Sequence, residues 1–341
     1  MYGRTAVKTV KQSLKKVDDM NMRKTVNSHK RRGGERNQGF AAEVRKNWRL
    51  FLMIMPAVLF FLIFNYGPMA GIYYAFTQYN FRGGLFGSPF IGLTNFKILI
   101  QNGSLGYLTR NTVLYNLVFI AAGNILEVLV AVLIHRLSSK KFKKISQSVI
   151  LFPYVISYVI VQVFAYAMLN GNSGAVTHFV REEMGAAGFN AYTTPGIWKY
   201  IIVLIYLWKN TGYGMIIYLA ALSGISKDYY EAAQIDGASA YQQIRYITLP
   251  QLTPTFITLL LLAIGNILRG QFELFYQLVG TNGLLYEQTD IFDTFVFRLL
   301  QNSFDVGLGT AAGLYQSFFG LFVVLSCNYF VKRSNPDYAL F

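Results

Sequence analysis

The sequence predicts an all-α polytopic membrane protein with about six transmembrane helices. Of its 341 residues, 53% are hydrophobic and only 14% are charged, and the mean hydropathy is +0.35. This composition is too apolar for a soluble domain. Apolar stretches of about 20 residues, the length that crosses the hydrocarbon core of a bilayer, recur along the chain. The positive charge gathers between these stretches rather than within them.

Six stretches have the length and composition of a span. They cover residues 50–75, 112–135, 148–170, 198–221, 254–276 and 309–331. The fifth is the least regular, because Arg269 and Glu273 interrupt its far end. Since these two residues are four apart, we expect them to pair if the helix continues through them.

The distribution of positive charge predicts the topology. The net charge is +15, and the first 49 residues contain fourteen Lys and Arg against four acidic residues. The segment 136–147 adds five basic residues and no acid. Cytoplasmic segments of membrane proteins carry this excess, so we expect a cell-membrane protein with both termini in the cytoplasm. Topology thus accounts for the charge, and nucleic acid is not expected as a partner.

These observations divide the chain into two parts. Residues 1–46 are predicted to be a basic, mostly disordered cytosolic tail, and residues 47–341 a membrane domain. The segments 77–111, 171–197 and 281–308 then lie outside the membrane, and none is long enough to form a folded receptor domain.

A polar segment separates the fourth and fifth spans at residues 225–253, on the cytoplasmic side. We expect two short helices in it, with a bend at Gly237, where a residue without a Cβ is favoured. Pro250 is expected to end the second helix. Two pairs have the spacing of a capping box: Asp228 with Glu231, and Ser239 with Gln242.

The centre of this polar segment carries a family resemblance. Residues 231–250 match the pattern EAA, three residues, G, nine residues, I-x-LP. In this they resemble the EAA coupling loop of the permease subunits of binding-protein-dependent ABC importers. The positions that correspond to the motif are Glu231, Ala232, Ala233, Asp236, Gly237, Ala238, Ile247, Leu249 and Pro250.

Four further runs are similar to the carbohydrate branch of these permeases, the LplB-like subunits related to maltose and glycerol-phosphate permeases. They are NYGPMAGIYYAF (65–76), PFIGLTNF (89–96), FPYVIS (152–157) and AAGLYQSFFG (311–320). One departure is His135-Arg136, where the resemblance leads us to expect an Asn-Glu pair.

The resemblance implies the fold of a type I ABC importer permease and a set of partners. These are a second homologous permease subunit, two cytosolic ATPase subunits, an extracellular sugar-binding protein, membrane lipid and a carbohydrate substrate. Glu231 is then expected to contact the ATPase, with Ala232 and Ala233 allowing close approach. Gly237 would form the bend, and Leu249-Pro250 would anchor the segment to the membrane.

The chain lacks the elements that bind nucleotide phosphates. It contains no G-x-x-x-x-G-K-[ST] run and no Gly-Lys dipeptide. We therefore expect no catalytic site and no cofactor in this chain, with ATP and Mg²⁺ on a partner ATPase. His29, His135 and His178 are scattered and Cys327 is the single cysteine, so neither a metal site nor an intrachain disulfide is expected.

Polar and aromatic residues within the predicted spans are candidates for a substrate path. A charge in hydrocarbon is costly, so such groups face the bundle interior or water. The candidates are Asn124, Glu127, Tyr158, Asn266, Arg269, Glu273 and Tyr276. The competing interpretation of each is a structural hydrogen-bond network or a packed aromatic ring.

Two other functional classes fit the sequence less well. A stand-alone secondary transporter or channel predicts inverted repeats and discontinuous helices. The sequence shows neither, and this class leaves the polar segment unexplained. An integral membrane enzyme requires a catalytic cluster, and no such cluster is evident.

Overall fold

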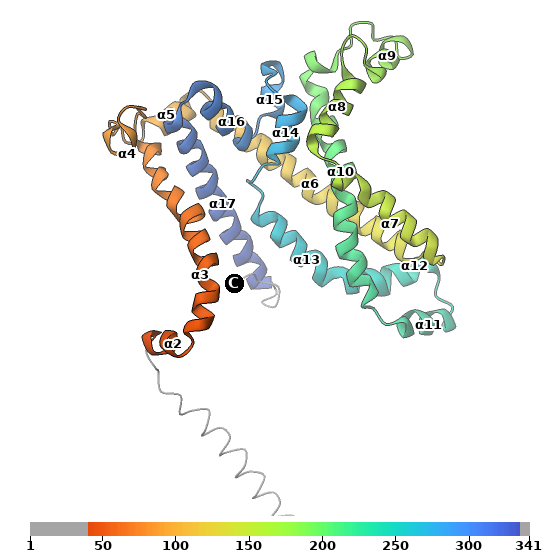
Figure 1. Cartoon of the computed structure of the whole chain (residues 1–341). Coiled ribbons are helices and arrows are strands. Elements are labelled where there is room, and N and C mark those ends of the chain that lie inside the picture. The colour runs from red at the N-terminus through yellow and green to blue at the C-terminus, as the bar shows by residue number, and fades with distance from the viewer. Residues whose placement is uncertain (1–39, 335–341) are drawn as a thin grey trace, which may run out of the picture. The chain divides into compact units, whose positions relative to one another are not determined.

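The computed structural model describes residues 40–334, drawn as the coloured ribbon in Figure 1. The described chain divides into two units, with the boundary between Ala70 and Gly71. The described residues are helical apart from turns, loops and one isolated antiparallel bridge between Thr77 and Phe90. This confirms the all-α prediction. The basic tail predicted for residues 1–46 lies almost wholly outside the described residues, so the predicted domain division stays a prediction.

The first unit contains most of the first span. It consists of α2 (Phe40–Lys46), α3 (Trp48–Phe61) and the π-helical turn η1 (Leu62–Tyr66). Apolar side chains are exposed all around α3, and Pro56 lies inside it. A helix that is apolar on every side is typical of a membrane span.

The second unit contains the remaining helices, and η2 (Gly67–Phe76) crosses the boundary between the units. In order they are α4 (Gly84–Gly87), α5 (Thr94–Gln101), α6 (Ser104–His135), α7 (Lys140–Val155), α8 (Tyr158–Leu169), α9 (Ala175–Glu182), η3 (Ala191–Thr193), α10 (Pro195–Ser223), α11 (Lys227–Ile235), α12 (Ala240–Gln243), η4 (Ile244–Thr248), α13 (Leu249–Gly265), α14 (Phe272–Val279), η5 (Gly283–Leu285), α15 (Tyr286–Thr289), α16 (Phe292–Arg298), η6 (Leu299–Ser303) and α17 (Val306–Ser334).

The candidate spans agree with the prediction in number and nearly in place. In the described part of the chain, five helices are long and apolar enough to cross a membrane, and the bent pair α7–α8 makes up to six. The five are Trp48–Phe76, Ser104–His135, Pro195–Ser223, Ala240–Gly265 and Val306–Arg333.

The fifth span requires a correction. Its helix begins at Ala240, inside the polar segment, and ends at Gly265 rather than at residue 276. Residues 266–271 are not helical, so Arg269 precedes α14 while Glu273 lies within it. The expected pairing of these two residues along one helix is therefore wrong.

Two helices of the membrane domain are interrupted, which the sequence did not reveal. The third span bends by 90° between α7 and α8. The fifth gives way to the non-helical residues 266–271 before α14. Interrupted helices are tolerated at membrane depth only where protein or water satisfies the backbone, so each break needs polar partners.

Helix α10 is central to the core of the second unit. It packs against α6 and α7 along its length, and Figure 1 shows the same neighbours. In its first half Trp198 and Ile202 are fully buried, with Phe275 of α14 packed in the same cluster. In its second half Met215 and Leu222 are fully buried and pack with α6 and α13. Helix α10 thus contributes to two apolar clusters, and the second includes Leu252 and the partly buried Ile244 of the polar segment.

Candidate functional site

The polar segment begins with α11, which is capped differently from the prediction. Ser226 is the N-cap, and its Oγ accepts a hydrogen bond from the main-chain N–H of Asp228 at 3.2 Å. The predicted cap at Asp228 is therefore wrong, because Asp228 lies in the first turn of the helix. An acidic residue there still favours the helix by opposing its dipole.

The end of α11 shows why a glycine occupies position 237. The N–H of Gly237 donates to the carbonyl of Gln234 at 3.1 Å, and that of Ala238 donates to Ala233 at 2.8 Å. This is the Schellman pattern, which needs a left-handed residue just after the helix. Gly237 supplies it with φ +75°, so the bend expected at this residue is confirmed.

The second helix of the segment has the predicted cap. Gln242 donates its main-chain N–H to the Ser239 Oγ at 3.3 Å, and the Ser239 N–H donates to the Gln242 Oε1 at 2.7 Å. Pro250, however, does not end this helix. The helical run continues from Ala240 to Gly265, and the π-helical turn η4 directly before α13 accommodates the N–H that Pro250 lacks.

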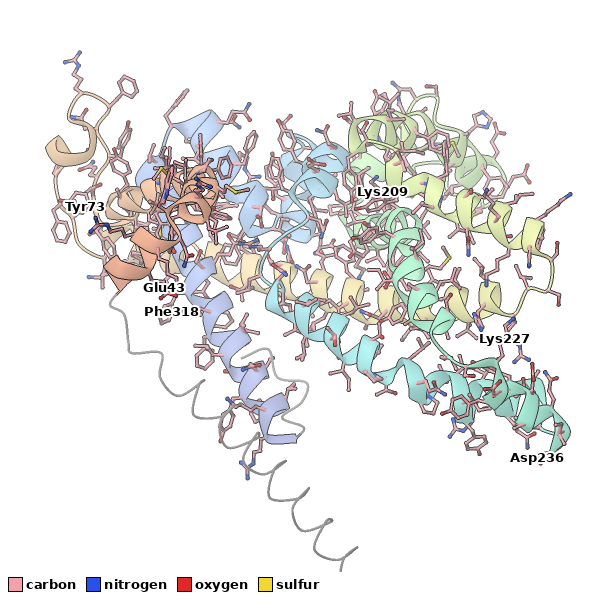
Figure 2. All side chains as sticks on the ribbon, turned by 60° about the horizontal axis from the view of Figure 1, so that its bottom comes forward. Glu43, Tyr73, Lys209, Lys227, Asp236 and Phe318 are labelled. Carbon is pink, nitrogen blue, oxygen red and sulfur yellow. The ribbon has the colours of Figure 1, made fainter. Side chains whose placement is uncertain are left out.

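The EAA residues lie on an exposed helix. Glu231, Ala232 and Asp236 are exposed, while Ala233 is half-buried against the rest of the segment. Figure 2 shows Asp236 at the tip of the segment, with Lys227 at the start of α11. Ile235 is 87% exposed, an unusual position for an isoleucine. The segment thus presents a small apolar and acidic surface.

A polar network fastens this segment to the end of α6. The guanidinium of Arg136 donates to the carbonyl of Ala240 at 2.6 Å and to the Gln243 Oε1 at 3.4 Å. Gln243 is buried and donates to the carbonyl of Ala238 at 3.2 Å. The hydroxyls of Tyr230 and Thr248 lie 3.0 Å apart and join α11 to η4. The two helices of the segment are therefore held together and to α6.

Arg136 is a functional candidate that the sequence did not single out. Its only signal was the unexpected His135-Arg136 pair at the end of the second span. Its partner Ala240 is 104 residues away along the chain, so only the folded structure brings the two together.

Asn124 and Glu127 lie together between α6 and α10. The hydroxyl of Tyr218 donates to the Asn124 Oδ1 at 2.7 Å, and both residues are buried. The carboxyl group of Glu127 lies directly over Gly214, where a Cβ would approach within 2.0 Å. The hydrogen bond of Asn124 fits the structural interpretation, while Glu127 is half-buried.

Tyr158 and Glu273 gather around Lys209, which the sequence did not single out. Lys209 of α10, labelled in Figure 2, is buried with 5% exposure at the break between α7 and α8. Its Nζ donates to the carbonyls of Pro153 at 3.3 Å, Tyr154 at 2.8 Å and Ile156.

The same Nζ lies 4.7 Å from the centre of the Tyr158 ring. Glu273 lies near enough to interact electrostatically with both Lys209 and Tyr158. An ammonium group has three hydrogens, and three carbonyls accept from this one, so Lys209 holds the broken helix rather than offering a free charge.

The remaining candidates divide between open and packed positions. Asn266 and Arg269 are exposed on the non-helical residues 266–271. Tyr276 is stacked on Phe272 with ring centres 5.2 Å apart and packs edge-on against Phe297. The packed-ring interpretation therefore fits Tyr276. The side chain of Arg269, in contrast, is exposed at the interruption of the fifth span.

Polar side chains from three helices support the backbone of residues 266–271. Gln316 of α17 donates to the carbonyl of Leu268 at 2.6 Å, and Asp293 of α16 accepts from the N–H of Gly270 at 2.8 Å. Asn116 of α6 donates to the carbonyl of Arg269 at 3.4 Å. These bonds satisfy backbone groups that a helix would have satisfied itself.

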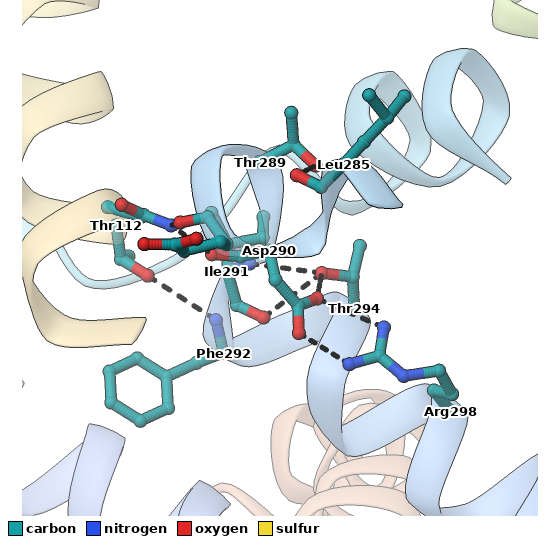
Figure 3. A network of polar contacts seen from close by, with 10 residues as sticks. Thr112, Leu285, Thr289, Asp290, Ile291, Phe292, Thr294 and Arg298 are labelled. Carbon is teal, nitrogen blue, oxygen red and sulfur yellow. Dashed lines mark hydrogen bonds and ion pairs between the residues drawn. The ribbon is translucent and has the colours of Figure 1, made fainter. Parts of the chain in front are cut away.

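A second polar network surrounds Asp290, beyond the fifth span (Figure 3). Its carboxylate is 2% exposed, accepts from Thr294 at 2.7 Å and forms an ion pair with Arg298. The guanidinium carbon lies 3.8 Å from the centre of the Tyr286 ring. Burial alone lowers the pKa of Arg298, but the hydrogen bond and charge of Asp290 outweigh it, and the pKa is raised.

Among the described residues, no group of three or more His, Cys, Asp or Glu side chains is placed to hold a metal ion.

Comparison with known proteins identifies the family. The profile of the binding-protein-dependent transport system inner membrane component matches residues 123–335. The chain belongs to the permease family of binding-protein-dependent ABC transporters. Its members are membrane subunits whose ATPase is a separate protein, so this permease is not itself an enzyme and carries no cofactor. The alternative of a stand-alone secondary transporter or channel is therefore wrong.

Curated relatives match over most of their length. Protein LplB of Bacillus subtilis is 32% identical over 298 residues, which cover 87% of this chain and 92% of LplB. The polygalacturonan/rhamnogalacturonan transport system permease YteP of the same organism is 32% identical over 288 residues, 84% of this chain and 89% of YteP.

A solved structure confirms the fold. A bacterial ABC transporter that imports the acidic polysaccharide alginate contains a chain that is 31% identical to this permease, with a TM-score of 0.77. The match covers 86% of this chain and 98% of that one. A bacterial alginate ABC transporter solved in complex with an alginate pentasaccharide-bound periplasmic protein also matches, at a TM-score of 0.76 and 31% identity.

Proposed function

We propose that this permease forms half of the translocation pathway of an ATP-driven importer for an oligosaccharide or polysaccharide. The other half belongs to a second homologous permease, and an extracellular sugar-binding protein delivers the substrate. The carbohydrate relatives and the alginate transporter support this substrate class. We place the polar segment and both termini in the cytoplasm, because the basic residues gather on that side of the spans.

The polar segment is the part that engages an ATPase subunit. The exposure of the EAA residues on α11 carries this proposal, and Arg136 holds the neighbouring helix α12 to α6. Glu231 makes the charged contact, and Ala232 and Ala233 permit close approach. Closure of the ATPase dimer then moves the segment as a rigid body and switches the pathway between its inward and outward openings.

Arg269 and Glu273 are our leading candidates for contact with the sugar. Both are exposed beside the interrupted fifth span, where a charge needs water or a polar partner. Tyr158 adds an aromatic face near Glu273, of the kind on which sugar rings stack.

The decisive experiment replaces Glu231 with Ala in the whole complex. We expect uptake to fall by about tenfold or more, the scale of a coupling free energy of about 1–3 kcal/mol. Assembly with the ATPase, measured by co-purification, should survive. Glu182→Ala is the matched control, since Glu182 is an exposed acid on α9, far from the polar segment in sequence. Normal uptake by the Glu231 variant would contradict the coupling role.

The substrate itself is identified by a glycan array probed with the binding protein that co-purifies with the complex. We expect oligosaccharides to bind in preference to amino acids and peptides. Binding of peptides alone would overturn the carbohydrate assignment and leave the coupling role intact.

A further inference from the structure

A groove of 620 Å³ runs between α6 and α10, at the end of these helices that is remote from the polar segment. This volume is typical of pockets that hold a small organic molecule, about 300–1,000 Å³. One wall is apolar and consists of Leu114, Val118, Val203, Leu204 and Leu207. All five residues belong to candidate spans, so the groove opens at membrane depth.

Two cations lie at the outer end of this apolar wall. Arg110 precedes Leu114 by four residues on α6, and Lys199 precedes Val203 by four residues on α10. Each is therefore one helical turn beyond the wall and on the same face as it. Both are exposed and line the groove.

Neither cation is neutralised by the described part of the protein. The described ion pairs involve His178 with Glu182 and Arg298 with Asp290. Arg110 makes only long hydrogen bonds, to the Asn111 Oδ1 at 3.4 Å and to the carbonyl of Glu287 at 3.5 Å. The Nζ of Lys199 lies 5.0 Å from the centre of the Tyr200 ring, an aromatic contact that leaves its charge uncompensated.

The back of the groove is rigid. Asn111 donates to the carbonyls of Glu287 and Asp290 at 3.0 and 3.1 Å. The hydroxyl of Tyr115 donates to the carbonyl of Gln288 at 2.9 Å. These bonds join α6 to the segment around α15, so the groove does not have to be ordered by its occupant, which lowers the entropic cost of binding.

We propose that the groove binds an anionic phospholipid. One acyl chain lies along the apolar wall, and the phosphate lies between Arg110 and Lys199. The arrangement of an apolar channel in the spans with two unneutralised cations at its outer end matches the chemistry of such a lipid. This inference concerns lipid retention and does not depend on the proposed transport function.

The test uses the whole complex, purified in detergent and titrated with phosphatidylglycerol or phosphatidylcholine, with bound lipid counted by native mass spectrometry. We expect phosphatidylglycerol to bind more tightly. Each of Arg110→Gln and Lys199→Gln should weaken it by about fivefold, the equivalent of about 1 kcal/mol per basic residue near a membrane surface. Phosphatidylcholine binding should change less.

Two further variants complete the test. Leu204→Trp fills the groove without altering its charge and should also displace phosphatidylglycerol. Lys97→Gln removes an exposed cation of α5 that does not line the groove, and it should leave binding unchanged. Equal retention of both lipids, or equal retention by wild type and the Arg110→Gln/Lys199→Gln double variant, overturns the proposal. The second result is expected if a helix of another subunit covers the groove.

Discussion

Gly237 determines the geometry of the polar segment at a single residue. Its φ of +75° places it in the left-handed region, and nothing within 4 Å surrounds the position of a Cβ. A side chain there therefore meets backbone strain and no steric clash.

We predict that Gly237→Val destabilises the turn by about 1–2 kcal/mol, the cost of left-handed backbone for an L-residue. The bend between α11 and α12 then changes, and uptake falls more than thermal stability. Sugar uptake and the melting temperature of the complex measure the two effects. Gly188→Val is the control, because Gly188 is exposed with open space around it and no positive φ. If both variants transport equally, the turn is not critical.

At this scale the sequence predicted some contacts and missed others. The Ser239–Gln242 box was predictable because both partners lie within one turn. The cap of α11 was assigned to Asp228 instead of Ser226 because several neighbouring side chains are able to cap, and only the backbone dihedral angles select one.

Among the elements, the bent pair α7–α8 depends on one side chain from another helix. At the break the buried ammonium of Lys209 donates to the carbonyls of Pro153, Tyr154 and Ile156, and the Pro153 carbonyl also accepts from the main-chain N–H of Ile156 at 3.3 Å. The aromatic rings of Tyr154 and Tyr158 lie 5.8 and 4.7 Å from the same nitrogen.

We predict that Lys209→Met, which keeps an unbranched side chain but removes its donors, destabilises the complex by about 3 kcal/mol or more. The reason is that the part-buried carbonyls of Tyr154 and Ile156 lose this donor, and carbonyls left without partners cost about 1–3 kcal/mol each. Thermal unfolding measures the loss, and spin labels on α7 and α8 report whether the 90° bend is retained. Lys140→Met, an exposed lysine at the other end of α7, should change stability by less than about 0.5 kcal/mol. An unchanged bend in the Lys209 variant would show that the break is held by other contacts.

The network around Asp290 holds the junction between α15 and α16, because Asp290 bonds Thr294 and Arg298 of α16. We predict that Asp290→Ala lowers stability by about 3–5 kcal/mol, because it leaves the half-buried Arg298 without its counter-ion. Glu287→Ala, which removes an exposed acid three residues away, is the matched control and should be nearly silent. The free energy of unfolding of both variants is measured by chemical denaturation. Equal stability of the two variants would show that the ion pair between Asp290 and Arg298 is dispensable.

For the molecule as a whole, Arg136 is the direct polar link between the second span and the polar segment. It bonds the Ala240 carbonyl and Gln243, so a displacement of the segment acts on α6. The cluster containing Leu222 and Leu252 carries the same displacement to α10 and α13.

We predict that Arg136→Gln lowers the number of sugar molecules imported per ATP hydrolysed by about fivefold or more, the lower range of allosteric coupling factors. ATP hydrolysis itself should persist, since the ATPase is a separate subunit. The ratio is measured with the complex reconstituted in vesicles. Arg245→Gln is the control, because Arg245 is exposed in the same segment. If the ratio is unchanged, the displacement of the polar segment is passed to the spans through the apolar cluster alone.

The sequence by itself determined the membrane class, the number of spans, the EAA positions and the need for an external ATPase. The length of apolar stretches, the position of basic segments and the spacing of motifs are local properties of the chain. They can therefore be recognised from the sequence alone. Only the tertiary structure decided where the third and fifth spans break, that Lys209 and Gln316 support those breaks, and that Arg136 meets Ala240. Each of these contacts joins residues 48 to 104 positions apart, and a buried backbone carbonyl accepts whichever donor the packing brings to it.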